Sequence, residues 1–200
     1  MVQAPSTSLT LEDFLARYGD DPRYELIDGE LRDLEPTGPH ESVAGKVAGY
    51  LFAEILRRGE RWTIPKNCLI RPPAYQATAL RPDVIILDEP ALEAEPLWQR
   101  EPIVSSGRPI VMVVEVVSTN WQDDYARKVE EYALLGIAEY WMVDFRGLGG
   151  VEFIGRPKQP SLTVCQLMGP DYDKRVYRLG EAIASHRFPN LTLRLDDLMA

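Results

Sequence analysis

The stretch Pro109-Ile110-Val111-Met112-Val113-Val114-Glu115-Val116-Val117 decides the fold of this chain. Almost all of its residues are apolar and most are β-branched, whereas a strand exposed on one face would alternate with polar residues. The stretch Arg81-Pro82-Asp83-Val84-Ile85-Ile86-Leu87 has the same character. Short apolar runs bounded by breaker residues predict strands that are covered on both faces. We therefore expect these two strands at the centre of a sheet.

The residues after Val117 predict how the sheet continues. A helix is expected from about Gln122 to Leu135, and Gly136 caps its end. The run Glu139-Tyr140-Trp141-Met142-Val143-Asp144 then has the composition of another strand. A strand, a helix and a strand in this order form a crossover connection, which predicts a parallel pair of strands.

The residues before the central strands predict an N-terminal helix and a hairpin. Thr10 is a capping residue before a helix that starts at Leu11, and Asp28-Gly29 between two strand-like runs is a strong β-hairpin signal. Apolar residues at helical spacing predict a long helix from about His40 to Arg58. Residues 62–71 are expected to form one or two strands.

The remaining segments predict additions to the sheet. Residues 88–108 are polar and contain three prolines, so we expect a loop there, with or without a short helix. Val151 to Ile154 and Leu162 to Met168 are predicted to be antiparallel strands. Residues 177–195 carry short strand signals and end in a helical turn. The expected fold class is α/β: a mixed sheet flanked by helices, with an N-terminal helix and a β-hairpin.

Length and composition favour one domain over residues 11–200, behind a disordered lead-in of residues 1–10. Of the 200 residues 45% are hydrophobic, but no apolar run is long enough to span a membrane. The lead-in lacks the features of a secretory signal and the two cysteines have no metal-ligand spacing, so we expect a cytoplasmic protein with reduced thiols. A net charge of −9 argues against broad, unspecific nucleic-acid binding but does not exclude a nuclease.

Two carboxylates stand out because the strands that carry them are otherwise apolar. Asp83 starts one strand and Glu115 lies near the end of the other, and a buried, unpaired charge is costly. If the strands are antiparallel neighbours, both carboxylates lie at one rim of the sheet and can share a cation. The chain has only two histidines, so carboxylates must dominate such a site, which suits Mg²⁺ or Mn²⁺. Alternatively, each carboxylate is solvated or paired with an arginine such as Arg81 or Arg108.

Lys128 is the third candidate. On the helix predicted after Glu115 it shares a face with Asp124 and Tyr132, one turn away on either side. A cation facing the rim can orient an attacking water or stabilise charge on a phosphate. The alternative is a solvated lysine that pairs with Asp124.

Glu25 and His40 are further candidates. Glu25 lies in a strand of the hairpin and could reach a metal or its water. His40 follows Pro39 at the start of a helix, and a helix N-terminus suits a phosphate. The alternatives are an exposed cross-strand glutamate and a capping histidine.

The ordered set Asp83, Glu115 and Lys128 resembles the active site of the PD-(D/E)XK nuclease superfamily. More closely, the chain is similar to a bacterial family described as restriction endonucleases, which is greatly expanded in cyanobacteria. The superfamily lysine normally lies two residues after the glutamate, where this chain has Val117, so Lys128 is the natural replacement. The matching segments lie within residues 11–145 and are Tyr24–Glu30, His40, Arg81–Val84, Val114–Ser118, Lys128, Tyr132, Gly136 and Glu139–Asp144.

The resemblance implies a restriction-endonuclease-like fold and a metal-dependent endonuclease that hydrolyses phosphodiester bonds in DNA. It implies that Asp83, Glu115 and the backbone carbonyl of Val116 bind Mg²⁺ or Mn²⁺, while Lys128 acts on the nucleophile or the phosphate. A homodimer is expected by analogy with members that cut both strands. The alternative function is a catalytically inactive module of the same fold that binds a protein or nucleic-acid partner, which the acidic charge favours. No glycine-rich phosphate loop or other motif indicates an organic cofactor.

Overall fold

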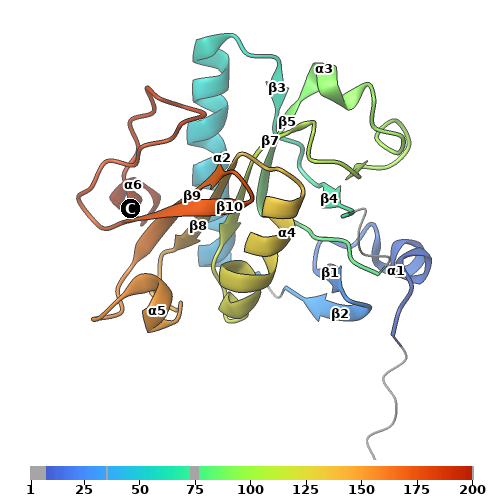
Figure 1. Ribbon diagram of the computed structural model, residues 1–200, viewed down its shortest axis with the longest axis horizontal. Helices are drawn as coiled ribbons and strands as arrows, with labels where there is room; N and C mark the ends of the chain where they lie inside the picture. The colour runs from blue at the N-terminus through green and yellow to red at the C-terminus, as the bar shows by residue number, and fades with distance from the viewer. Residues whose placement is uncertain (1–7, 35, 73–76, 200) are drawn as a thin grey trace, which may run out of the picture.

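The computed structural model describes residues 8–34, 36–72 and 77–199, which form a mixed sheet with helices on both faces (Figure 1). Residues 1–7 of the predicted lead-in lie outside the described residues. The main sheet has six strands in the order β10-β9-β8-β7-β5-β3. Their bounds are β3 Trp62–Thr63, β5 Val84–Asp88, β7 Ile110–Val116, β8 Glu139–Asp144, β9 Ser161–Met168 and β10 Asp171–Tyr177.

The two apolar stretches are the central strands, as predicted. All residues of β7 are buried, and the strand pairs with β5 on one side and β8 on the other. The β5–β7 pair is antiparallel, with Val84 opposite Val114, and the β7–β8 pair is parallel. The start of β5 therefore lies beside the end of β7, which brings Asp83 next to the segment that carries Glu115.

Separate apolar cores cover the two faces of the sheet. On one face α2 (Gly38–Arg58) packs through residues such as Val47 and Leu51, with α6 (Leu195–Met199) beside it. On the other face the helical segment that ends in α4 (Lys128–Leu134) packs through Tyr125 and Tyr132. Figure 1 shows α2 and α4 on opposite sides of the strands.

The helix that follows β7 begins with a π-helical turn. Asp123–Arg127 forms this turn, and α4 continues it from Lys128. The predicted helix is thus confirmed, but its first part is wider than an α-helix. No helix in the described part of the chain combines the length and hydropathy that crossing a membrane requires.

The N-terminal elements form a small unit below the main sheet. Helix α1 (Leu11–Tyr18) begins after Thr10, whose hydroxyl accepts a hydrogen bond from the Asp13 amide. Strands β1 (Tyr24–Ile27) and β2 (Glu30–Asp33) form the predicted hairpin. Asp28 and Gly29 at its turn have φ angles of 51° and 80°, which explains why this dipeptide occurs there.

The segment between β3 and β7 contains three more short elements. Strands β4 (Leu69–Ile70) and β6 (Ile103–Val104) pair in parallel as a separate sheet. The predicted loop between the central strands holds a single helical turn, α3 (Glu89–Leu92), that Asp88 caps.

Two C-terminal predictions need correction. Val151–Ile154 is not a strand but the helical turn α5, which Gly150 precedes and Gly155 ends with a φ of 76°. The predicted strand at Leu162 to Met168 is confirmed as β9, which pairs antiparallel with β8 on one side and, on the other, with β10 (Asp171–Tyr177), which was not predicted. Because β10 is a charged strand at the sheet edge, it has no apolar alternation to mark it.

Candidate active site

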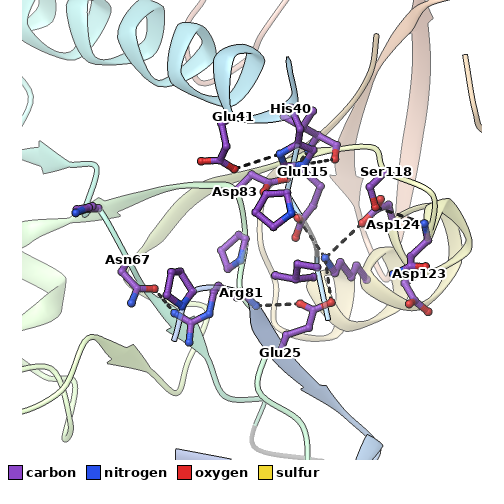
Figure 2. Close-up of a pocket in the computed structure, with 18 residues that line it drawn as sticks. Glu25, His40, Glu41, Asn67, Arg81, Asp83, Glu115, Ser118, Asp123 and Asp124 are labelled. Carbon is purple, nitrogen blue, oxygen red and sulfur yellow. Dashed lines mark hydrogen bonds and ion pairs between the residues drawn. The ribbon is translucent and has the colours of Figure 1, made fainter. Parts of the chain in front are cut away.

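A cleft opens at the rim where β5 begins and β7 ends, and its lining is mostly charged (Figure 2). Among the described residues, six carboxylates, three cations and one histidine line it. The carboxylates belong to Glu25, Glu41, Asp83, Glu115, Asp123 and Asp124, the cations to Lys66, Arg81 and Lys128, and the histidine is His40. All five side chains proposed from the sequence therefore line one cleft.

The antiparallel register places the Asp83 and Glu115 carboxylates together. Asp83 directly precedes Val84, which lies opposite Val114. One carboxylate oxygen of Asp83, Oδ2, accepts a hydrogen bond of 2.7 Å from the amide of Val116, the residue after Glu115. Glu115 is buried, whereas the Asp83 side chain keeps 18% of its surface exposed to the cleft. Neither carboxylate forms an ion pair with Arg81 or Arg108 among the described residues, so pairing with either arginine is not observed.

The ammonium group of Lys128 lies between three carboxylates from three different elements. Its Nζ is 3.2 Å from Glu115 Oε2 on β7, 3.5 Å from Glu25 Oε1 on β1 and 3.3 Å from Asp124 Oδ1 on the π-helical turn. The side chain is only 4% exposed. Lys128 is thus not a solvated lysine, although it does pair with Asp124.

Burial and mutual charge set the protonation of this group. Burial raises the pKa of Glu115 well above its usual value; Lys128 lowers it, while the nearby carboxylates add to the rise. Asp124 has a pKa raised to about 7, mainly by burial. Burial opposes the charged form of Lys128, but Glu115, Glu25 and Asp124 together hold its pKa well above the usual value. Lys128 therefore stays protonated at neutral pH and has no lone pair with which to accept a proton.

Tyr132 fixes the orientation of Glu115. The Tyr132 hydroxyl donates a hydrogen bond of 2.6 Å to Glu115 Oε1, and both groups are buried. Asp124, Lys128 and Tyr132 lie one turn apart on the helix after β7, and together they form one face at the end of that strand. The helical spacing predicted this common face, but not the contact of Tyr132 with Glu115.

Glu25 joins the hairpin to the site. Its Oε1 approaches Lys128, and its Oε2 accepts a hydrogen bond of 3.1 Å from the amide of Arg81. The side chain is 2% exposed, so the alternative of an exposed cross-strand glutamate is wrong. The sequence did not predict that the amide of Arg81, two residues before Asp83, binds Glu25 and so links the hairpin to the segment before β5.

His40 contacts the rim from the start of α2. Its Nε2 is 2.9 Å from the carbonyl oxygen of Val116 and 3.4 Å from Asp83 Oδ2, and its Nδ1 is 3.4 Å from Glu41 Oε1. Burial opposes protonation, but the hydrogen bond and charge of Asp83 raise the pKa of His40 to about 9. A protonated ring can donate from both nitrogens, which satisfies these acceptors. Contact with a phosphate stays a prediction.

The donor set fits a hard divalent cation by its chemistry. Asp83 and Glu115 offer carboxylate oxygens, and Val116, the residue after Glu115, offers its backbone carbonyl. Asp83 lines the cleft, its Oδ1 has no hydrogen-bond partner among the described residues, and the described lining has more carboxylates than cations. The described residues do not include three or more His, Cys, Asp or Glu side chains arranged as a metal cluster.

The comparisons with known proteins agree with this fold. A model of the Uma2 family, described as "Putative restriction endonuclease", matches residues 11–196. No curated protein matches the chain. Among solved structures, a "putative nuclease belonging to DUF820" from Anabaena variabilis superposes with a TM-score of 0.69 at 15% sequence identity, over 96% of this chain and 97% of that one.

Proposed function

Because the chain belongs to the Uma2 restriction endonuclease family, we propose that it is a divalent-metal-dependent endonuclease that hydrolyses phosphodiester bonds in DNA. One observation supports this proposal above the others. The carboxylates of Asp83 and Glu115 meet at one rim through the antiparallel β5–β7 pair, and the Lys128 ammonium lies 3.2 Å from Glu115.

The oxygen ligands and the lysine of the site have different proposed roles. We propose that Asp83, Glu115 and the Val116 carbonyl hold Mg²⁺ or Mn²⁺, with Asp83 as the more exposed ligand. When bound, the cation lowers the pKa of a coordinated water and polarises the phosphate. Lys128 compensates the buried carboxylates and stabilises negative charge near the phosphate. The three carboxylates around it raise its pKa, which favours this electrostatic role over that of a general base.

Glu25 and His40 act through other residues. Glu25 helps to place the Lys128 ammonium and connects it to Arg81. His40 donates toward Asp83 and the Val116 carbonyl, and so orients two of the three proposed ligands. Both are positioning residues in this proposal.

Cleavage of supercoiled plasmid tests the function directly. We expect wild-type protein to nick or linearise the plasmid with Mg²⁺ or Mn²⁺ and to be inactive with EDTA. Asp83→Asn keeps the shape but removes the charge, so it should lower the rate by roughly 10²-fold or more, as loss of a charged catalytic group does. Linear product that appears without a nicked intermediate supports a homodimer that cuts both strands. Activity on RNA but not on DNA would contradict the proposed substrate.

Metal binding has a readout that is independent of cleavage. A ligand that binds only the native state raises the melting temperature, so Mg²⁺ or Mn²⁺ at millimolar concentration should stabilise the wild type. The shift should be smaller in Asp83→Asn and unchanged in Glu12→Gln, an exposed acid on α1. If calorimetry detects no divalent-ion binding to the wild type, the metal-dependent mechanism fails.

A further inference from the structure

The cleft carries an excess of negative charge, which the proposed metal ion would neutralise only in part. Six carboxylates line it among the described residues, yet its proposed substrate is a polyanion. A strand that passes through needs cations for the phosphates beside the scissile one. Three basic side chains of the described part of the chain line the cleft, and they differ in whether they are free to bind a phosphate.

Lys128 and Arg81 are already engaged with protein groups. The Lys128 ammonium is enclosed by three carboxylates. Arg81 is 5% exposed, and its guanidinium donates to the carbonyls of Tyr24 and Gly19, at 3.1 and 3.0 Å, and to the side chain of Asn67. Redirecting either side chain to a phosphate would leave buried carboxylates or carbonyls without a donor, which is costly.

Lys66 differs from both. It is exposed, lines the cleft, and has no hydrogen bond or ion pair within the described residues. Its ammonium is therefore available to a ligand without loss of any protein contact. A flexible stem with a compact charge suits a phosphate oxygen.

The fold places Lys66 in the lining of the same cleft as the proposed metal ligands. Strand β3 runs antiparallel to β5, with Thr63 opposite Leu87. The chain after Thr63 therefore runs toward the first residue of β5, which Asp83 directly precedes. The next residue after Lys66, Asn67, accepts the hydrogen bond from Arg81, two residues before Asp83. Figure 2 shows Asn67 and Arg81 joined at one side of the cleft, with Glu41 and His40 on another.

We propose that Lys66 binds a backbone phosphate of the nucleic-acid strand that enters this cleft, next to the phosphodiester bond that is cleaved. This role rests on the proposed endonuclease function. It makes Lys66 a substrate-binding residue that contacts no metal ligand. The contact is to the phosphate and not to a base, so it contributes equally to every sequence.

The salt dependence of binding tests the role of Lys66. Binding of a fluorescein-labelled 20-base-pair DNA duplex is measured by anisotropy at several KCl concentrations, with Ca²⁺ as the divalent ion. Each phosphate contact contributes about 0.9 to the slope of log affinity against log salt. Lys66→Ala should reduce the slope by about this amount and weaken binding at low salt, while Lys66→Arg should restore both.

Lys174→Ala is the matched control. Lys174 is an exposed lysine on β10, at the sheet edge opposite to β3, and it does not line the cleft. It removes the same net charge far from the site, so its slope should equal that of the wild type. With Mg²⁺, kcat/KM for plasmid cleavage should fall in Lys66→Ala by the same factor as the duplex affinity.

The outcomes separate this proposal from the function on which it rests. If the wild type cleaves DNA but Lys66→Ala keeps the slope and affinity of Lys174→Ala, Lys66 is not a phosphate contact and the endonuclease function stands. If the wild type neither binds nor cleaves DNA with any divalent ion, both proposals are overturned. A reduced slope in Lys66→Ala alone, rescued by arginine, supports the assignment.

Discussion

Lys128 is the cation around which the buried charges of the site are arranged. Its three carboxylate partners come from β1, β7 and the π-helical turn, and none of the three is exposed. Removing one partner of a buried ion pair costs about 3–5 kcal/mol because the remaining charge is left uncompensated. Lys128→Ala should therefore lower the free energy of unfolding by about that amount in metal-free protein, measured by urea denaturation. Mg²⁺ should recover part of it, since a second cation can replace the ammonium.

The catalytic effect of Lys128 is measured on the same variants. Lys128→Ala should lower plasmid cleavage by roughly 10²-fold or more at a temperature where the variant remains folded. Lys128→Arg keeps a charge that cannot accept a proton, so it should retain more activity than the alanine variant. Unchanged cleavage in Lys128→Ala, with stability altered by less than about 0.5 kcal/mol, is the result expected of a solvated lysine and would remove it from the site.

The sequence predicted the residues of this site where burial makes a charge conspicuous. Asp83 and Glu115 could be found because an apolar strand rarely carries a carboxylate without a partner. The role of Asp124 could be foreseen only as a helical neighbour of Lys128, because its approach to the ammonium depends on the π-helical turn. The sequence did not point to Lys66, because an exposed lysine in a loop has no distinctive pattern. Only the strand order of the folded chain shows that its loop lines the cleft.

Strand β8 also anchors the C-terminal segment, through one buried carboxylate. Glu139 accepts hydrogen bonds from the Trp141 indole, the Ser185 hydroxyl and the amides of His186 and Arg187, at 2.6–3.0 Å. It lies at the opposite end of its strand from Asp144 and takes no part in the cleft lining. This contact is structural.

Glu139→Gln tests the anchor. The amide keeps the shape but turns one acceptor into a donor that faces other donors, so it should destabilise the protein by about 1–3 kcal/mol in urea denaturation. Hydrogen exchange should rise at residues 185–187. The melting-temperature shift caused by Mg²⁺ should persist, because the site is made by other strands. Equal exchange rates in the variant and the wild type would contradict the anchor.

Long elements with a clear period were predictable, and short ones were not. The pattern from His40 to Arg58 and the two central strands appear in the structure as α2, β5 and β7. The strand prediction for Val151–Ile154 was wrong because a run of three apolar residues and Glu152 suits a strand and a helical turn equally, and the flanking glycines, not the composition, decide between them. Strand β10 was not predicted because its charged sequence has no strand pattern of its own. It forms a strand through its pairing with β9.

The two thiols report on the integrity of the sheet face that α4 covers and of the small sheet. Cys165 on β9 and Cys68 before β4 are each at most 2% exposed, and burial raises the pKa of both to about 12. The thiolate is the reactive form. Native protein at pH 8 should therefore react very slowly with a disulfide reagent such as Ellman's, and both thiols should react at once in urea. Rapid labelling under native conditions would show that one of these regions opens.

The long connection between the two central strands lies away from the candidate site. Strands β5 and β7 carry the site at one end, so residues 89–109 leave and re-enter the sheet at the other end. Within them, residues 99–102 are exposed. Exposed tips of this kind accept insertions because few contacts are lost there. Recombination could therefore lengthen this connection, or graft a DNA-reading domain into it, without moving Asp83 or Glu115, which offers a route by which one cutting scaffold can acquire different targets.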